Sequence, residues 1–109
     1  MSEKQHMIED SKRFILKNIQ NMDVIKSAAN QIQMSYESFR KAFAWQTGES
    51  LGQYCKRLKI DLAKTLLSTT NWKILIIAKE CGYQSERAFN RAFKRIVGKT
   101  PGQFRIEPD

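Results

Sequence analysis

Apolar residues recur at helical spacing in the last third of the chain. One stripe consists of Phe89, Ala92, Phe93, Ile96 and Val97. A shorter stripe precedes it and consists of Ile74, Ile77, Ala78 and Cys81. Apolar positions three and four residues apart predict amphipathic helices that bury one face. The turn at Gly82-Tyr83, followed by an N-cap at Ser85 and a helix end at Gly98, predicts a helix-turn-helix.

The same pattern occurs in the first half of the chain. Its two stripes consist of Val24, Ile25, Ala28, Ala29 and Ile32, and then of Phe39, Ala42 and Phe43 after an N-cap at Ser35. At an offset of 50 residues the halves are identical at the pairs Phe39/Phe89, Ala42/Ala92, Phe43/Phe93, Gly48/Gly98, Gly52/Gly102 and Gln53/Gln103. This internal identity predicts two copies of one supersecondary unit.

Further helices surround the two copies. A hydroxyl three residues before a glutamine marks a capped helix start in Ser50-Leu51-Gly52-Gln53 and in Thr100-Pro101-Gly102-Gln103. The second start predicts a short helix that ends at Phe104-Arg105. The first predicts a long helix from Ser50 to about Leu67, with the stripe Leu51, Tyr54, Cys55, Leu58, Leu62 and Leu66. A helix over Met7–Ile19 precedes them and buries Ile8, Phe14, Ile15 and Ile19.

The predicted fold class is therefore all-α. Two helix-turn-helix (homeodomain-like) subdomains, over residues 1–49 and 69–109, are joined by a linker helix over residues 50–68. The composition agrees, because 41% of the 109 residues are apolar and only 5 are Gly and 2 Pro. The longest apolar run, Ile74–Ala78, is far too short to span a bilayer, and the N-terminus lacks a signal-peptide core. We expect a cytoplasmic protein with no membrane partner.

The positive charge is concentrated in the second half of the chain. The formal net charge is +8; residues 1–50 carry 7 Lys+Arg and 6 Asp+Glu, whereas residues 51–109 carry 12 and 5. Two basic clusters hold most of the excess: Lys56, Arg57, Lys59 and Lys64, then Arg87, Arg91, Lys94, Arg95, Lys99 and Arg105. No acid occurs between Arg87 and Arg105. A solvated surface usually mixes both signs, so this distribution favours a polyanionic partner.

Catalytic and metal-binding patterns are missing from the sequence. Cys55 and Cys81 are 26 positions apart and His6 is the one histidine, so a four-ligand zinc site cannot be assembled. We expect two reduced, packed thiols, with a disulfide or redox switch as the alternative. The sequence has no Gly-rich phosphate loop and no nucleophile elbow. It predicts no enzyme, no metal and no cofactor.

The second copy and its flanks resemble the C-terminal signature of the AraC/XylS transcription regulators. The resemblance rests on residues 78–85 (AKECGYQS), 89–95 (FNRAFKR) and 98–105 (GKTPGQFR), and it extends over about residues 8–106. The length is similar to that of the short stand-alone stress-response activators of this family, although a fragment of a longer regulator is the alternative. The resemblance implies seven helices, binding of double-stranded DNA as a monomer, and activation through contact with RNA polymerase.

Alignment with the family, together with the polar faces of the two outer helices, predicts the DNA-binding residues. In the first unit they are Ser35, Tyr36, Glu37, Arg40 and Lys41. In the second unit they are Ser85, Glu86, Arg87, Asn90, Arg91, Lys94 and Arg95. Arg40 and Arg91 can pair with guanine and Asn90 with adenine. Lys94 and Arg95 near the helix end suit phosphates, and a phosphate contact remains the alternative for each arginine.

The linker sets the expected spacing of the two outer helices. About 18 residues at a rise of 1.5 Å span roughly 27 Å, which with the bulk of the units gives a separation near one DNA turn, about 34 Å. Both helices can then enter successive major grooves. Because their sequences differ, we expect an asymmetric site.

Two departures from the family pattern affect the first unit. Gln33 stands where the family usually has Gly, so we expect a turn that is strained or differently shaped. Ala44 and Trp45 replace the basic pair found as Lys94-Arg95, which removes two phosphate contacts. We therefore expect the second unit to dominate binding.

Apolar residues on the scaffold helix of the second unit add a candidate partner surface. Leu75 or Ile76 should be partly exposed, and together with Trp72 they either pack locally or contact RNA polymerase or a second copy.

The leading hypothesis is a sequence-specific transcription regulator, acting as an activator. The alternative is an interaction protein of the same fold that binds DNA weakly or non-specifically and acts through RNA polymerase or another regulator.

Overall fold

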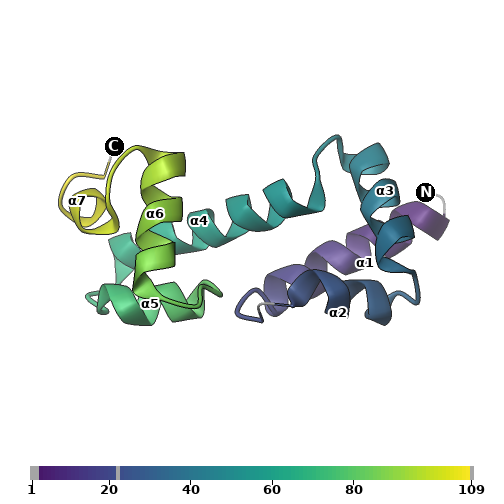
Figure 1. The fold of residues 1–109 in the computed structure, drawn as a ribbon, viewed down its shortest axis with the longest axis horizontal. Helices are drawn as coiled ribbons and strands as arrows, with labels where there is room; N and C mark the ends of the chain where they lie inside the picture. Colours follow the sequence, from purple (N-terminus) through teal and green to yellow (C-terminus); the bar gives the residue numbers. More distant parts are fainter. Residues whose placement is uncertain (1–2, 22, 109) are drawn as a thin grey trace. The chain divides into compact units, whose positions relative to one another are not determined.

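The computed structural model describes residues 3–21 and 23–108, apart from the side chain of residue 4. Every regular element in these residues is a helix (Figure 1). The helices are α1 (Glu3–Lys17), α2 (Val24–Gln31), α3 (Tyr36–Thr47), α4 (Leu51–Thr69), α5 (Ile74–Glu80), α6 (Glu86–Val97) and α7 (Pro101–Ile106). The prediction of an all-α fold with seven helices is confirmed for the described part of the chain.

The chain divides into two compact units, residues 1–57 and 58–109. Helix α4 contributes its first residues to one unit and the rest to the other. In the first unit α1, α2 and α3 contact one another (Figure 1). The buried apolar residues there are Ile8, Ile15, Ile19, Val24, Ala28, Ala29, Phe39, Phe43, Leu51 and Cys55. The ring of Phe43 packs between Phe39 and Tyr54, at centroid distances of 6.1 and 5.0 Å.

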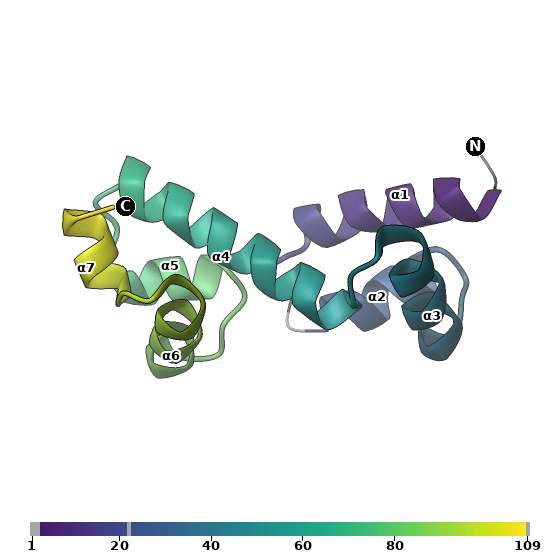
Figure 2. The same ribbon diagram turned by 90° about the horizontal axis from the view of Figure 1, so that it is seen from above.

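The second unit has a core of its own. Helices α5, α6 and α7 lie on one side of the second part of α4 and form a core with it (Figure 2). Their buried residues are Ile60, Ala63, Leu67, Ile77, Ala78, Cys81, Phe89, Phe93 and Phe104. The aromatic rings of Phe89, Phe93 and Phe104 follow one another at centroid distances of 5.7 and 5.5 Å. This core fixes α6 with its polar face outward.

Local chemistry sets the helix ends as the sequence predicts. The hydroxyl oxygens of Ser35 and Ser85 accept from the N–H groups of Ser38 and Ala88, at 3.1 and 3.0 Å. Both outer helices end at a left-handed glycine. Thr100 and Gln103 form the full capping box that starts α7. At the start of α4 the Ser50 hydroxyl accepts from the N–H of Gln53 at 3.2 Å.

The two interhelical turns have the same backbone form. Gln33 lies at φ 58° and Gly82 at φ 84°. The N–H of Met34 bonds to the carbonyl of Ala29, and the N–H of Tyr83 to that of Ala78, both at 3.0 Å. The first turn is therefore not reshaped. Because the left-handed region is unfavourable for residues with a Cβ, it carries backbone strain at Gln33.

Several burial predictions need correction. Ile96 is 49% exposed, because Val97 takes the inward position in the last turn of α6 and packs on the core. In α4 the fully buried residues after Arg57 are Ile60, Ala63 and Leu67, while Leu58, Leu62 and Leu66 are half-buried. The prediction of one continuous apolar stripe on α4 is wrong here, because α4 packs against different helices in each unit.

The first helix also differs from the prediction. Phe14 is half-buried, and the helix occupies Glu3–Lys17 instead of Met7–Ile19.

Both thiols are packed inside the units. Cys55 and Cys81 are buried and form no disulfide. Burial raises the pKa of the Cys81 thiol to about 12.

None of the described helices is both long and apolar enough to cross a bilayer.

Candidate nucleic-acid interface

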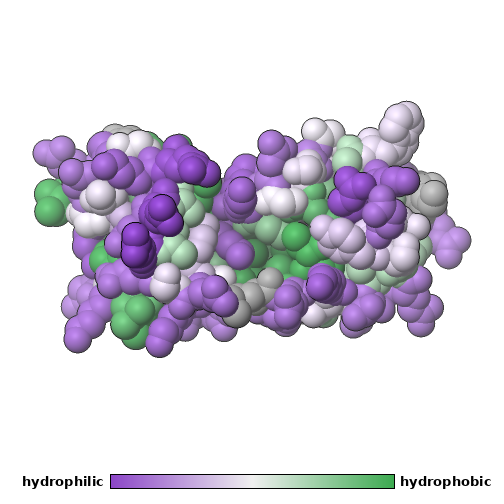
Figure 3. All heavy atoms as spheres, viewed as in Figure 1, coloured by the Kyte–Doolittle hydropathy of each residue, from purple (hydrophilic) through white to green (hydrophobic). Residues whose placement is uncertain are grey.

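The outer face of α6 is polar and mainly basic. Phe89 and Phe93 anchor the helix from the inside, and the six residues Glu86, Arg87, Asn90, Arg91, Lys94 and Arg95 lie on its other sides. All of them are exposed except Asn90, which is half-buried. Strongly hydrophilic side chains accordingly lie over part of α6 in Figure 3. Arg91 and Arg95 line a shallow groove together with Ala88 and Ala92.

The outer face of α3 has a different electrostatic organisation. Tyr36, Glu37, Arg40 and Lys41 are all exposed there. One Glu37 carboxylate oxygen lies 3.0 Å from Nη2 of Arg40 and 3.8 Å from Nζ of Lys41. A single acid therefore pairs with both predicted reading cations. At an offset of 50 residues α6 carries Arg87 in place of this acid.

The two serines predicted to bind DNA start the outer helices. Ser35 and Ser85 are exposed, and each uses its hydroxyl oxygen to cap its own helix. The oxygen is then occupied as an acceptor, while the hydroxyl hydrogen remains available as a donor. These serines are thus placed for contact with an acceptor such as a phosphate.

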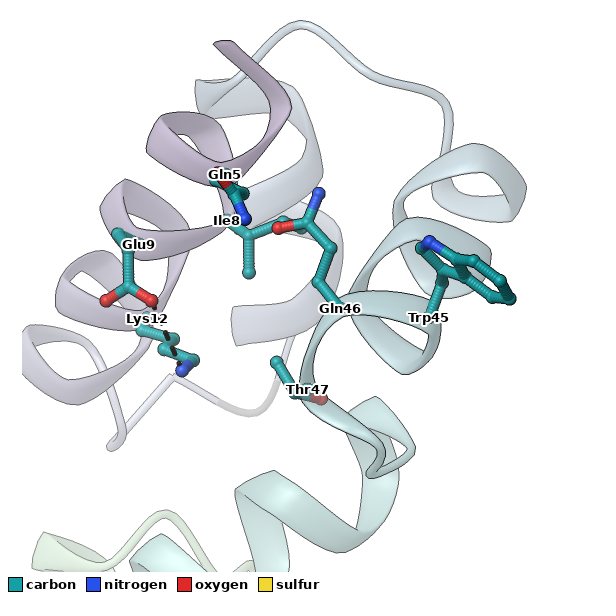
Figure 4. A pocket seen from close by; sticks show the side chains of 7 residues that line it. All are labelled: Gln5, Ile8, Glu9, Lys12, Trp45, Gln46 and Thr47. Carbon is teal, nitrogen blue, oxygen red and sulfur yellow. Dashed lines mark hydrogen bonds and ion pairs between the residues drawn. The ribbon is translucent and has the colours of Figure 1, made fainter. Parts of the chain in front are cut away.

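The C-terminal ends of the two outer helices differ most. Lys94 and Arg95 are exposed cations at the end of α6, where the helix dipole favours positive charge. At the matching positions of α3, Ala44 is exposed and Trp45 is 89% exposed. Figure 4 shows the Trp45 ring directed away from the α1 side chains Gln5, Ile8, Glu9 and Lys12.

Comparison with known proteins identifies the architecture. A family model described as a helix-turn-helix domain matches residues 28–106. The chain belongs to the AraC-type helix-turn-helix family. This family comprises DNA-binding domains of transcriptional regulators and not enzymes.

Curated relatives of the AraC type are longer than this chain. The transcriptional activator RhaR of Enterobacter sp. (strain 638) is 34% identical over 82 residues, which cover 75% of this chain and 29% of RhaR. The regulator Rv1931c of Mycobacterium tuberculosis is 32% identical over 81 residues, covering 74% of this chain and 31% of that protein. The chain thus spans under a third of the length of these two relatives.

Solved structures share the AraC-type fold. The C-terminal domain of AraT, a response regulator from Geobacillus stearothermophilus, has a TM-score of 0.88 and 25% identity, over 95% of this chain and 87% of that one. The DNA-binding domain of AdpA, solved in complex with a target DNA, has a TM-score of 0.84 and 23% identity, over 91% and 89% of the two chains.

Several basic residues of this AraC-type chain have partners within the fold. Arg105 donates to the carbonyl oxygens of Leu67 and Thr70, both at 3.3 Å, and so ties α7 to the end of α4. Lys59 and Lys64 lie over the rings of Tyr83 and Phe104. Arg57 pairs with Glu49 at 2.9 Å, and this hydrogen bond lowers the Glu49 pKa. Sequence counting could not separate these cations from those of α6, because both groups have the same residue types.

An exposed apolar group lies at the start of α5. Trp72, Leu75 and Ile76 are 42, 41 and 43% exposed, while Ile77 behind them is fully buried. Where the sequence predicts exposure for one of Leu75 and Ile76, the structure exposes both.

Within the described residues there is no group of three His, Cys, Asp or Glu side chains that could hold a metal ion.

Proposed function

We propose that this AraC-type chain is a sequence-specific DNA-binding transcription regulator that acts as an activator. The observation that carries the proposal is the outer face of α6, where exposed cations and Asn90 project from a helix anchored by Phe89 and Phe93. Its curated relative RhaR is named a transcriptional activator, and the similar AdpA domain was solved with target DNA. A rigid helix presenting arginine and asparagine is suited to read base edges in the major groove.

In the proposed mechanism α3 and α6 enter successive major grooves of one duplex. The two reading subdomains are residues 1–49 and 69–109, and residues 50–68 link them. Arg91 and Asn90 read guanine and adenine, Lys94 and Arg95 hold phosphates, and Arg40 reads guanine in the other groove. A single chain supplies both reading helices, so it binds as a monomer. The site is asymmetric because α3 and α6 differ.

The exposed apolar group of α5 is proposed to contact RNA polymerase. Trp72 just before α5 and Leu75 and Ile76 in its first turn are exposed apolar residues, separate in sequence from the α6 reading residues. Exposed apolar side chains that cluster in one short segment commonly mark protein contacts, whereas single exposed apolar residues are ordinary. On this proposal, the regulator recruits polymerase while α6 stays on DNA.

A charged replacement tests the polymerase contact. Ile76→Glu should keep specific DNA affinity and lose activation in a purified transcription assay. Ile106→Glu is the matched control, because Ile106 is an 82% exposed isoleucine of the same unit and should keep both activities. Equal activation by Ile76→Glu and wild type would contradict the contact. A change in oligomeric state would instead assign the surface to self-association.

One observation supports a second candidate function. Glu37 pairs with both cations of α3, which weakens the attraction of the first unit for DNA. The chain would then be an interaction protein of the same fold that binds DNA weakly or non-specifically and acts through polymerase or another regulator. Non-specific binding depends on phosphates and falls steeply with salt, whereas specific recognition retains a sequence preference.

Selection of bound sequences from a random duplex library at physiological salt separates these functions. The proposed regulator should enrich an asymmetric site with two boxes about one helical turn apart. A single enriched box would restrict base reading to one unit. No enriched sequence would contradict the regulator and favour the interaction protein.

A further inference from the structure

The last turn of α3 carries a tryptophan that the fold leaves almost uncovered. Trp45 is 89% exposed, and Ala44 beside it is exposed as well. A tryptophan usually buries most of its large ring in a core or an interface. Within the first unit Phe39 and Phe43 already fill the inner face of α3, so the core makes no use of Trp45.

The position of Trp45 makes it continuous with the proposed reading face. It follows Lys41 by four residues, which places the two side chains on one side of the helix. Trp45 and Lys41 also line the same shallow depression, together with Ser38 and Ala42. Figure 4 shows the indole ring of Trp45 turned away from the α1 side chains.

The charges of α3 indicate what kind of contact this face can make. Glu37 pairs with Arg40 and Lys41, and the helix end carries Ala44 and Trp45 where α6 has two cations. An indole has one N–H donor and no charge, so it is a poor substitute for Arg95 at a phosphate. The apolar group that the major groove offers to such a side chain is the C5-methyl of thymine.

We propose that Trp45, with Ala44 beside it, packs against a thymine methyl group in the major groove entered by α3. The inference rests on the proposed function and names a specificity-determining contact within it. The first unit then adds an apolar contact to the proposed Arg40 contact, while the second reads through arginine, asparagine and phosphate contacts. The two boxes of the site differ in chemistry: one requires a thymine at a fixed position, and the other a hydrogen-bonding pattern.

Deoxyuridine supplies the sharpest test, because it differs from thymidine in a duplex by the single methyl group. Each thymine of the selected site is replaced singly by deoxyuridine, and affinities are measured by fluorescence anisotropy. One replacement in the box read by the first unit should weaken wild-type binding about threefold to tenfold, as expected for loss of one buried methyl contact. Trp45→Ala should bind the thymine and deoxyuridine duplexes equally.

Two further variants are compared with wild type and Trp45→Ala in the deoxyuridine experiment. Ile106→Ala removes an exposed apolar side chain, 82% exposed, that lies outside the reading helices and the proposed polymerase contact, and it should keep the wild-type response to deoxyuridine. Trp45→Arg restores the basic residue found at the matching position of α6. It should lose the deoxyuridine response and bind with a steeper salt dependence. Since Trp45 is exposed, unchanged far-UV circular dichroism should accompany both Trp45 variants.

Other outcomes would overturn the inference. A wild type indifferent to every deoxyuridine, or a Trp45→Ala variant as sensitive as wild type, would exclude the methyl contact. Unchanged DNA binding by Trp45→Ala with lost activation would assign Trp45 to a protein partner. If Arg91→Ala abolishes specific binding while Trp45→Ala does not alter it, the proposed function stands and this inference fails. If wild type shows no specific binding, the proposed function itself fails.

Discussion

Single backbone positions decide how closely the two units resemble each other. Gln33 adopts φ 58° to make the turn that Gly82 makes at φ 84°. The left-handed conformation costs a residue with a Cβ about 1–2 kcal/mol, while glycine loses more entropy on folding. The first unit therefore carries a local strain that the second avoids.

Gln33→Gly should relieve this strain. We expect the free energy of unfolding to rise by about 0.5–1 kcal/mol, because the saving at positive φ exceeds the added entropy cost of glycine. Urea unfolding followed by circular dichroism measures the change. The reciprocal variant Gly82→Gln should lower stability by at least about 0.5–1 kcal/mol, because it adds the same strain at a position that is also buried. A destabilised Gln33→Gly variant would show that the Gln33 side chain makes contacts that outweigh the strain.

Residue-level chemistry was the most predictable part of this protein. The N-caps at Ser35 and Ser85 and the capping box at Thr100 follow from local sequence and are present. They are predictable because the hydroxyl and the backbone N–H that it binds lie three residues apart. The shape of the turn at Gln33 was not predictable to the same degree, since tertiary packing imposes the glycine conformation on another residue.

Helices α3 and α6, which occupy equivalent positions in the two repeat units, carry different charges on their outer faces. In α3 the acid at Glu37 pairs with Arg40 and Lys41, whereas α6 has Arg87 at the corresponding position. Exposed ion pairs contribute little to stability, so this pairing matters less for the fold than for binding. A phosphate approaching α3 meets a negative charge at this position, whereas the acid of α6, Glu86, stands one position earlier.

Glu37→Gln should therefore strengthen DNA binding. We expect several-fold higher affinity at low salt and a steeper dependence of affinity on salt, because Arg40 and Lys41 become available to phosphates. Anisotropy titrations from about 50 to 200 mM salt measure both effects. Glu9→Gln is the matched control: it removes an acid with an i,i+3 ion pair to Lys12 on α1 and should change affinity less. Weaker binding by Glu37→Gln would indicate that the carboxylate itself accepts a hydrogen bond from a base, such as the cytosine amino group.

The sequence predicts where the helices lie more reliably than it predicts which face of each helix is buried. All of the expected helices are present, because their apolar periodicity is strong and their ends are capped. The predicted apolar stripe of α4 does not match the buried residues after Arg57, and the prediction that Ile96 is buried is wrong. Both errors have one cause: periodicity gives an average apolar direction, while burial depends on which neighbouring helix is present at each turn.

At the scale of the whole molecule, net charge indicates a polyanionic partner but not where it binds. Arg105 bonds to carbonyl groups, Lys59 and Lys64 lie over aromatic rings, and Arg57 pairs with Glu49. Arg87, Arg91, Lys94 and Arg95 are the exposed cations that share the outer face of α6, whereas Lys56, Lys73 and Lys79 are exposed elsewhere. Sequence placed the candidate reading residues on the exposed faces of α3 and α6, but only the structure shows which other cations have partners within the fold. The assignment of those reading residues to DNA remains a prediction.

The asymmetry between the units leads to unequal roles for two arginines. Arg91 lies on α6 in a groove that also contains Arg95, whereas the Arg40 guanidinium is 3.0 Å from Glu37. Arg40 must exchange this partner for DNA, so its net contribution is smaller. Arg91→Ala should lower affinity for the selected site about 10- to 100-fold, and Arg40→Ala less than about threefold.

The salt dependence distinguishes how Arg91 acts. If it pairs with guanine, Arg91→Ala relaxes the sequence preference at one position and leaves the salt slope nearly unchanged; if it binds phosphate, the slope falls by about one with no change in preference. Arg13→Ala, which removes an arginine paired with Asp10 on α1, controls for the loss of one positive charge. An Arg40→Ala variant as damaging as Arg91→Ala would mean that α3 releases its arginine from Glu37 on DNA. The first unit would then contribute to binding as much as the second, despite carrying far less of the positive charge.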